Sequence, residues 1–291
     1  MRGAAGARIT RATFKGEFMR RLSISAAWDE SKVIFARDGQ LLTAVALALV
    51  ALPSAINGLL NPAGVTPSET PWWIDLIAVL ASLIALGGQL ALIRLALGPS
   101  ITVGGAIAHG MRRLPIYFLA VLMLVIALFI AAIPLALLLS ALGVPINQRP
   151  VPMSPALGLV SIAVLVVVLI IGVRLILSSS VASAEDVGPI QILKRSWRLT
   201  SGNFLPLLGF VLIFLVGTII VLTAVGSATS VIVRLTLGAA QPMSAAALVL
   251  ALVSSLVSAA VTTVFAVMLA RIYLQLAGRG EAEAGVPSSG S

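Results

Sequence analysis

The chain has 291 residues, of which 59% are hydrophobic and 10% are charged. A soluble globular domain carries roughly 25% charged residues, so this composition favours a protein whose apolar surface faces a bilayer. The absence of cysteine excludes disulfides, cysteine metal sites and thiol catalysis. The net charge is +9, and the basic residues that carry it lie between apolar runs and not among stacking aromatic residues. We therefore interpret this charge as facing the membrane surface and expect no nucleic-acid partner.

Residues 1–22 form a basic tail without the hydrophobic region of a signal peptide. Beyond it lie six uncharged apolar runs, each able to cross a bilayer as a helix of about 20 residues. They are Leu41–Leu60, Leu76–Ile93, Leu114–Leu142, Ala156–Val173, Phe204–Gly226 and Met243–Ala270. Ala163–Val173 is apolar on every side, which favours helices over the alternating strands of a membrane barrel. The sequence therefore predicts an all-α fold, a polytopic membrane protein with six transmembrane helices in three hairpins.

Lysine and arginine are distributed unevenly between the two sides of such a protein. Of the 19 basic residues, all but Arg149 and Arg234 fall before the first span, after the even-numbered spans or in the connections between hairpins. By the positive-inside rule, that side and both termini are cytoplasmic. The opposite loops are rich in Pro, Gly and Ser, and we expect them to be irregular. They are Asn61–Pro71, Gly143–Pro155 and Ser227–Pro242.

An internal repeat connects these elements. A short amphipathic stretch precedes each odd-numbered span, at Ser23–Asp38, Thr102–Leu114 and Gly188–Arg198. We expect these stretches to be helices at the cytoplasmic membrane interface. Each even-numbered span ends in apolar–Arg–Leu/Ile–x–Leu, at Arg94, Arg174 and Arg271. The sequence thus predicts three repeats, about 23–98, 99–184 and 185–277, in a membrane domain 23–277 followed by a disordered tail 278–291.

The third amphipathic stretch is the clearest. Pro189 suits a first helical position, and Gly202 follows the end. Ile190, Leu193 and Trp197 share one face.

Because each repeat holds two spans, all three repeats enter the membrane in one orientation. That would place a pseudo-threefold axis along the membrane normal, around either a cavity or a closed centre.

Basic residues near the cytoplasmic surface are the candidate contacts for lipid headgroups. They are Arg94, Arg112, Arg113, Arg174, Lys194, Arg195, Arg198 and Arg271. The arginines that end the even-numbered spans could form a ring that binds headgroups or an anionic substrate. They could also snorkel to the interface without a ligand, which is the interpretation that we favour.

We find no catalytic, cofactor-binding or metal-binding motif and expect no enzymatic activity and no cofactor. His109 is the only histidine and has no carboxylate close in sequence. The centres of the six runs hold no charged residue, which argues against proton relays and ion-coupled pumps. Ser254, Ser258 and Thr262 form a hydroxyl stripe that indicates close helix packing or a hydrated pathway, and Gly87-Gly88 indicates packing.

Gly188–Leu208 (GPIQILKRSWRLTSGNFLPLL) carries a family resemblance. A small residue and Pro, a basic helix with Ser196-Trp197-Arg198-Leu199-Thr200, then Gly-Asn-Phe and a span resemble a bacterial six-helix membrane-domain superfamily. That superfamily includes the membrane domain of glycerophosphodiester phosphodiesterases and related membrane proteins of unknown function. The resemblance implies a bacterial inner (plasma) membrane location. It implies no diesterase activity, because this chain lacks the soluble barrel and the metal-binding residues of that reaction.

Three classes of function remain in view. The first is a non-enzymatic, lipid-associated organising, sensing or scaffolding role, with anionic headgroups as partners and any protein partner left open. The second is a permease for a small or amphiphilic solute, with a polar path lined by Gln89, Ser258 and Thr262. The third and least supported is a membrane-embedded enzyme.

Overall fold

The computed structural model describes residues 22–61, 71–98, 102–141 and 155–284, so most of the predicted tail 1–22 lies outside them. Within these ranges every regular element is a helix. Six helical segments are long and apolar enough to cross a membrane. They are Ile24–Leu60, Trp72–Leu97, Val103–Ser140, Leu157–Ala184, Phe204–Thr236 and Ala245–Gly278. The expectation of an all-helical chain with six long apolar helices is confirmed.

The first of these segments consists of three consecutive helical pieces. They are α2 (Ile24–Ala46), the π-helical turn η1 (Leu47–Ala51) and α3 (Leu52–Leu60). The Ser23 hydroxyl caps α2 by accepting a hydrogen bond from the Ala26 amide at 3.2 Å. Pro53 has no amide hydrogen to offer the preceding turn, and π turns commonly absorb such a break.

Glycines let the next two helices, α4 (Trp72–Leu97) and α5 (Val103–Ala141), approach their neighbours closely. A Cβ at Gly88 would lie 2.6 Å from the Leu49 Cβ of the first span. A Cβ at Gly110 would lie 2.6 Å from the Gly87 carbonyl oxygen. Helix α4 therefore packs on both sides through small residues, as the Gly87-Gly88 pair predicts.

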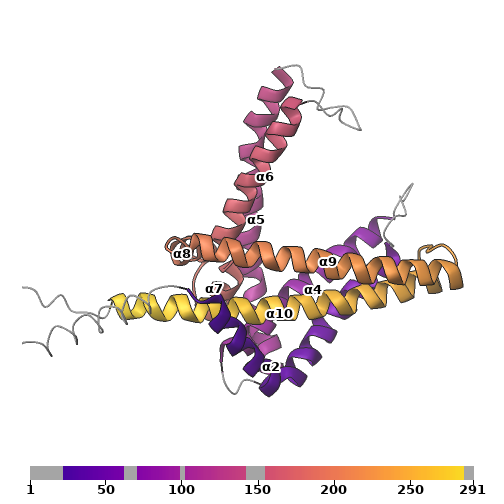
Figure 1. The fold of residues 1–291 in the computed structure, drawn as a ribbon, viewed down its shortest axis with the longest axis horizontal. Helices are drawn as coiled ribbons and strands as arrows, with labels where there is room; N and C mark the ends of the chain where they lie inside the picture. Colours follow the sequence, from indigo (N-terminus) through magenta and orange to yellow (C-terminus); the bar gives the residue numbers. More distant parts are fainter. Residues whose placement is uncertain (1–21, 62–70, 99–101, 142–154, 285–291) are drawn as a thin grey trace, which may run out of the picture.

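The remaining elements are five helices joined by short connections. They are α6 (Pro155–Leu175), α7 (Ser178–Ala184), α8 (Pro189–Thr200), α9 (Phe204–Thr236) and α10 (Ala245–Ala284). Helix α10 packs against α2, α3, α4 and α9, and so lies at the centre of the molecule (Figure 1).

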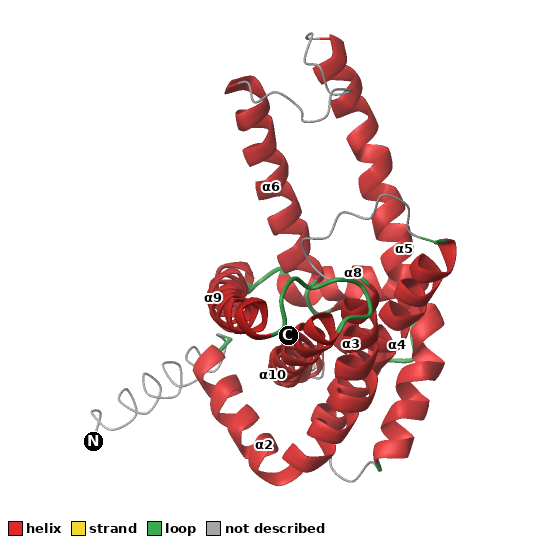
Figure 2. Cartoon of the chain, turned by 90° about the vertical axis from the view of Figure 1, so that its right-hand side faces the viewer, coloured by secondary structure: helices red, strands yellow, loops and turns green. Residues whose placement is uncertain are grey.

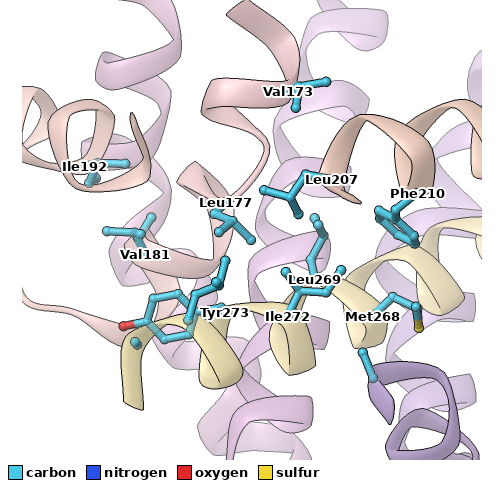
Figure 3. Close-up of a cluster of buried hydrophobic side chains, with 14 of the residues drawn as sticks. Val173, Leu177, Val181, Ile192, Leu207, Phe210, Met268, Leu269, Ile272 and Tyr273 are labelled. Atoms are coloured by element: carbon cyan, nitrogen blue, oxygen red, sulfur yellow. The ribbon is translucent and has the colours of Figure 1, made fainter. Parts of the chain in front are cut away.

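A buried apolar cluster joins the ends of α6, α7, α8, α9 and α10 (Figure 3). Leu177 and Ile272 are fully buried in it, and Phe210 stacks on Phe265 with ring centroids 6.2 Å apart. A second cluster joins the first span to α4 and α10. Together the two clusters tie the ends of the helices into one core.

The far half of the second hairpin extends away from this core. Figure 1 shows α5 and α6 rising away from α9 and α10, and crosswise to them. Most side chains in the outer half of the hairpin are exposed, with Phe129 72% and Leu165 66% exposed. Spans one, two and six pack on one another and form the centre, and the arrangement of the three hairpins about one axis stays a prediction.

Three boundaries differ from the sequence-based expectation. The amphipathic stretches of the first two repeats are the first turns of the long helices α2 and α5. Of the three stretches, only the third forms a helix of its own, α8. Helix α9 continues through Ser227 and Ser230 to Thr236, and these hydroxyls bond back to carbonyls one turn earlier. Helix α10 reaches Ala284, past the point where the tail was predicted.

Candidate functional site

The geometry around the basic residues of α8 depends on how this helix is docked. Helix α6 ends at Leu175, so the Arg174 carbonyl lies among the last carbonyls that lack a partner in their own helix. The Ser196 hydroxyl of α8 donates to this oxygen at 3.0 Å. The Thr200 hydroxyl lies 3.1 Å from the same oxygen and shares its single hydrogen with the Ser196 and Trp197 carbonyls, each at 3.0 Å. The two contacts with the Arg174 carbonyl fix α8 across the end of α6.

The buried face of α8 is therefore not the one that the apolar periodicity predicts. Ile192, Ser196 and Thr200 are buried, whereas Ile190 is 50% and Trp197 46% exposed. The carbonyl at the end of α6 requires hydroxyl partners, and this requirement outweighs the burial of the apolar stripe. Ile190 and Trp197 instead face outward beside the basic residues, whereas Leu193 is half-buried against the core.

Arg174 itself lies between two aromatic rings. Its guanidinium carbon is 5.3 Å from the centre of the Trp197 ring and 5.4 Å from that of Phe204. Both distances are within the range of cation–π attraction. The side chain thus connects α6 to α8 and α9 and holds the exposed Trp197 ring in place.

Two basic residues of the candidate set are neutralised by acidic partners. The Arg195 Nε donates to the Glu185 carboxylate at 3.0 Å, and the Tyr273 hydroxyl donates to the same oxygen at 2.8 Å. Buried Arg113 forms an ion pair with Asp186. These contacts link α5, α8 and α10 through the segment that follows α7, so their first role is structural.

Three other basic residues keep their charge available at the surface. Arg112, Lys194 and Arg198 are exposed and have no carboxylate partner within the part of the chain that the structure describes. Lys194 and Arg198 lie one turn apart on α8, next to Trp197. We call the surface formed by Lys194, Trp197 and Arg198 the basic face. It presents an aromatic ring beside two cations that lack a carboxylate partner among the described residues.

Two of the arginines that end the even-numbered spans, Arg174 and Arg271, contact different elements, and the ring stays a prediction. Arg271 donates to the Ala96 carbonyl at the end of α4, at 2.6 Å. Arg94 occupies the last turn of α4 and Arg174 the last turn of α6, where a cation is favoured by the helix dipole. These positions agree with a structural role at the ends of the spans.

His109 is a structural link between helices. Its Nε2–H donates to the Ser183 carbonyl of α7 at 3.0 Å. The Ser183 hydroxyl donates in turn to the Leu90 carbonyl of α4 at 3.2 Å. The described residues hold no group of His, Asp or Glu side chains that could bind a metal ion.

Among the cavities on the described surface, two contain polar side chains. One, of about 370 Å³, lies between the outer ends of α3, α9 and α10 and is lined by Asn61, Thr229, Ser230 and Ser254 among apolar residues. Gln89, Ser258 and Thr262, predicted to line a polar path, are not part of it. The other, of about 630 Å³, lies between α5, α6 and α8 and reaches the basic face.

Comparison with family models gives one match. A domain of unknown function, DUF7847, matches residues 23–276, which is nearly the whole predicted membrane domain. The chain belongs to the DUF7847 family. The match makes no link to glycerophosphodiester phosphodiesterase membrane domains, so that resemblance stays a prediction. No curated protein and no solved structure matches the chain.

The sequence located the basic residues of this DUF7847 domain but not their partners. The docking role of Ser196 and Thr200 and the shared carboxylate of Glu185 were missed. A signal was available for the hydroxyls, because Ser196 and Thr200 are spaced at i, i+4 on a helix that follows a span end. The serine-rich helix α7, with Ser178, Ser179, Ser180 and Ser183 buried, was missed too.

Proposed function

We propose that this protein is a multi-pass protein of the bacterial inner membrane, with both termini cytoplasmic, that acts without catalysis. It binds anionic phospholipid headgroups at its cytoplasmic side and thereby organises or senses lipid, or scaffolds a partner there. The observation that supports this most is the basic face, where Lys194 and Arg198 lie unpaired beside the exposed Trp197 ring.

Physical chemistry of the interface supports the assignment. An amphipathic helix that exposes an aromatic ring and cations suits the boundary between headgroups and acyl chains. Each Lys or Arg near an anionic membrane surface contributes about 1 kcal/mol of attraction. The uneven distribution of the 19 basic residues along the chain favours the cytoplasmic leaflet for this side.

Quenching of Trp197 by brominated lipids tests this proposal. A variant with Trp28→Phe, Trp72→Phe and Trp73→Phe keeps Trp197 as its sole tryptophan, because the chain has four. In mixed bilayers, we expect brominated phosphatidylglycerol to quench this residue more than brominated phosphatidylcholine at equal mole fraction.

Charge variants test whether the two cations of the basic face cause this lipid preference. The pair Lys194→Gln and Arg198→Gln should remove the preference, whereas Arg234→Gln, at the opposite end of α9, should leave it unchanged. Equal quenching by both lipids in the otherwise native protein would overturn the proposal.

The outer cavity supports a permease as a second candidate. It contains the hydroxyls of Thr229, Ser230 and Ser254, which could accompany a small polar solute. Proteoliposomes should then take up glycerol faster than empty vesicles, and Ser254→Phe should abolish the difference. Uptake equal to that of empty vesicles would remove this candidate.

A further inference from the structure

The cavity between α5, α6 and α8 has two chemically different ends. Its apolar wall comes from both helices of the second hairpin, with Leu124 and Leu128 on α5 and Ile171 and Leu175 on α6. Its rim comes from α8. Figure 2 shows α5 and α6 rising from the level of α8 as two separate columns. An elongated apolar group could therefore enter between the two helices from the α8 side.

The rim is cationic. Lys194, Arg198 and the ring of Trp197 line it, one turn apart along α8. The Ser201 hydroxyl, also at the rim, already donates to the Arg198 carbonyl at 2.7 Å. Two cations at this spacing can both contact one phosphate group, and neither has a carboxylate partner among the described residues.

The walls of the cavity are held in place by contacts on its far side. The Arg174 guanidinium stacks on Trp197, and the Arg174 carbonyl binds Ser196 and Thr200. The cavity volume of about 630 Å³ lies in the range of roughly 300–1,000 Å³ that is common for small-molecule sites. A ligand would therefore meet a site whose α8 side is already positioned.

We infer that this cavity is a specific site for one anionic glycerophospholipid. Its phosphate lies against Lys194 and Arg198, and one acyl chain lies between α5 and α6 against Leu124 and Ile171. The inference rests on the proposed function and goes beyond it, because headgroup attraction alone requires no place for a chain. A bound lipid would also cover apolar surface that the sparse packing of this hairpin leaves open.

Native mass spectrometry of the full chain, purified with phosphatidylglycerol in mild detergent, tests the site. Ala127 lines the cavity on α5, so Ala127→Phe should fill it while leaving both cations intact. The matched control is Ala132→Phe, an exposed position on the other side of the same helix. We expect one retained lipid in the wild type and the control, and about a tenfold loss in Ala127→Phe, because about two buried CH2 groups are worth a tenfold change in affinity.

A second measurement uses the wild type alone, so its result does not depend on whether the Ala127→Phe variant folds. Dioleoyl-phosphatidylglycerol should be retained, whereas dihexanoyl-phosphatidylglycerol and glycerol phosphate, with short chains or none, should be lost at equal concentration. Equal retention of all three would overturn the chain site and indicate a headgroup site only.

The outcomes separate this inference from the proposed function. If Ala127→Phe retains the lipid as well as the control does, the inference is wrong. If no single lipid is retained while Trp197 still prefers brominated anionic lipid, the site is wrong and the proposed function stands. If both the retained lipid and the preference are absent, both are wrong.

Discussion

Single atoms decide how closely α4 and α5 can approach. Gly110 faces the backbone of α4, where a Cβ would lie 2.6 Å from the Gly87 carbonyl oxygen and 3.0 Å from the Ala91 amide nitrogen. Backbone atoms cannot swing aside as the end of a flexible side chain can. The two helices would have to separate to accept even a methyl group.

We therefore expect Gly110→Ala to destabilise the protein by about 1–3 kcal/mol, the usual cost of overpacking. Thermal unfolding in mild detergent, followed by helical circular dichroism, measures this loss. Gly104→Ala is the matched control on the same helix, because no atom lies within 4 Å of its Cβ position. Alanine favours helices over glycine, so the control should be neutral or slightly stabilised. Equal loss in both variants would contradict the account.

At the same scale, the sequence shows which residues are charged, but not which of them are paired. Arg195 and Lys194 are neighbours with the same predicted role, yet only Arg195 reaches Glu185. The difference arises from the segment after α7, whose path depends on tertiary packing and not on local pattern.

At the scale of elements, α8 is the test of how well a pattern predicts a fold. Its bounds, Pro189–Thr200, follow from Pro189 at its start and the Ser201-Gly202 turn after it. The buried face does not follow from periodicity, because a helix that caps another helix buries hydroxyls. Sequence periodicity describes an average environment and cannot include one specific carbonyl acceptor.

The docking of α8 can be tested by removing its two hydroxyls. The pair Ser196→Ala and Thr200→Val leaves the Arg174 carbonyl without donors, a loss of about 1–3 kcal/mol. Hydrogen exchange of residues 189–200, measured by mass spectrometry, should become faster. The control pair Ser227→Ala and Thr236→Val removes exposed hydroxyls that bond within α9, and should not change it. Unchanged exchange in the first pair would show that other contacts hold α8.

At the scale of the whole molecule, the six apolar helices were predictable because composition and run length alone specify them. The arrangement of the hairpins was not, and the threefold repeat stays a prediction. Lipid-facing surfaces are apolar whichever helix they cover, so apolar patterning carries little information on which spans meet. The core of spans one, two and six depends on small residues such as Gly58 and Ala251, where a Cβ on Gly58 would lie 3.1 Å from that of Ala251.

The crosswise second hairpin leads to a prediction about the bilayer. Helices that cross one membrane tilt by at most about 40° from its normal, so α5 and α6 must swing toward the direction of α9 and α10 there. The outer halves of α5 and α6 are exposed and have few contacts that would oppose this swing. The cavity beside α8 is lined by residues of α5, α6 and α8 near the base of this hairpin.

Spin labels measure this swing directly, since the chain has no native cysteine. Labels at Leu138→Cys on α5 and Leu235→Cys on α9 mark the outer ends of the second and third hairpins, and both positions are exposed. Dipolar distances in lipid nanodiscs should be clearly shorter than the separation in this structure. A distance equal to that separation would contradict the alignment.

The central claim is that six spans place α8 and its basic face on the cytoplasmic side. Two single-cysteine variants test it most directly: Gln191→Cys on the exposed side of α8, and Thr236→Cys at the opposite end of α9. A membrane-impermeant maleimide should label Thr236→Cys in right-side-out vesicles and Gln191→Cys in inside-out vesicles. Labelling of Gln191→Cys from the outside, or of both variants from the same side, would contradict the account.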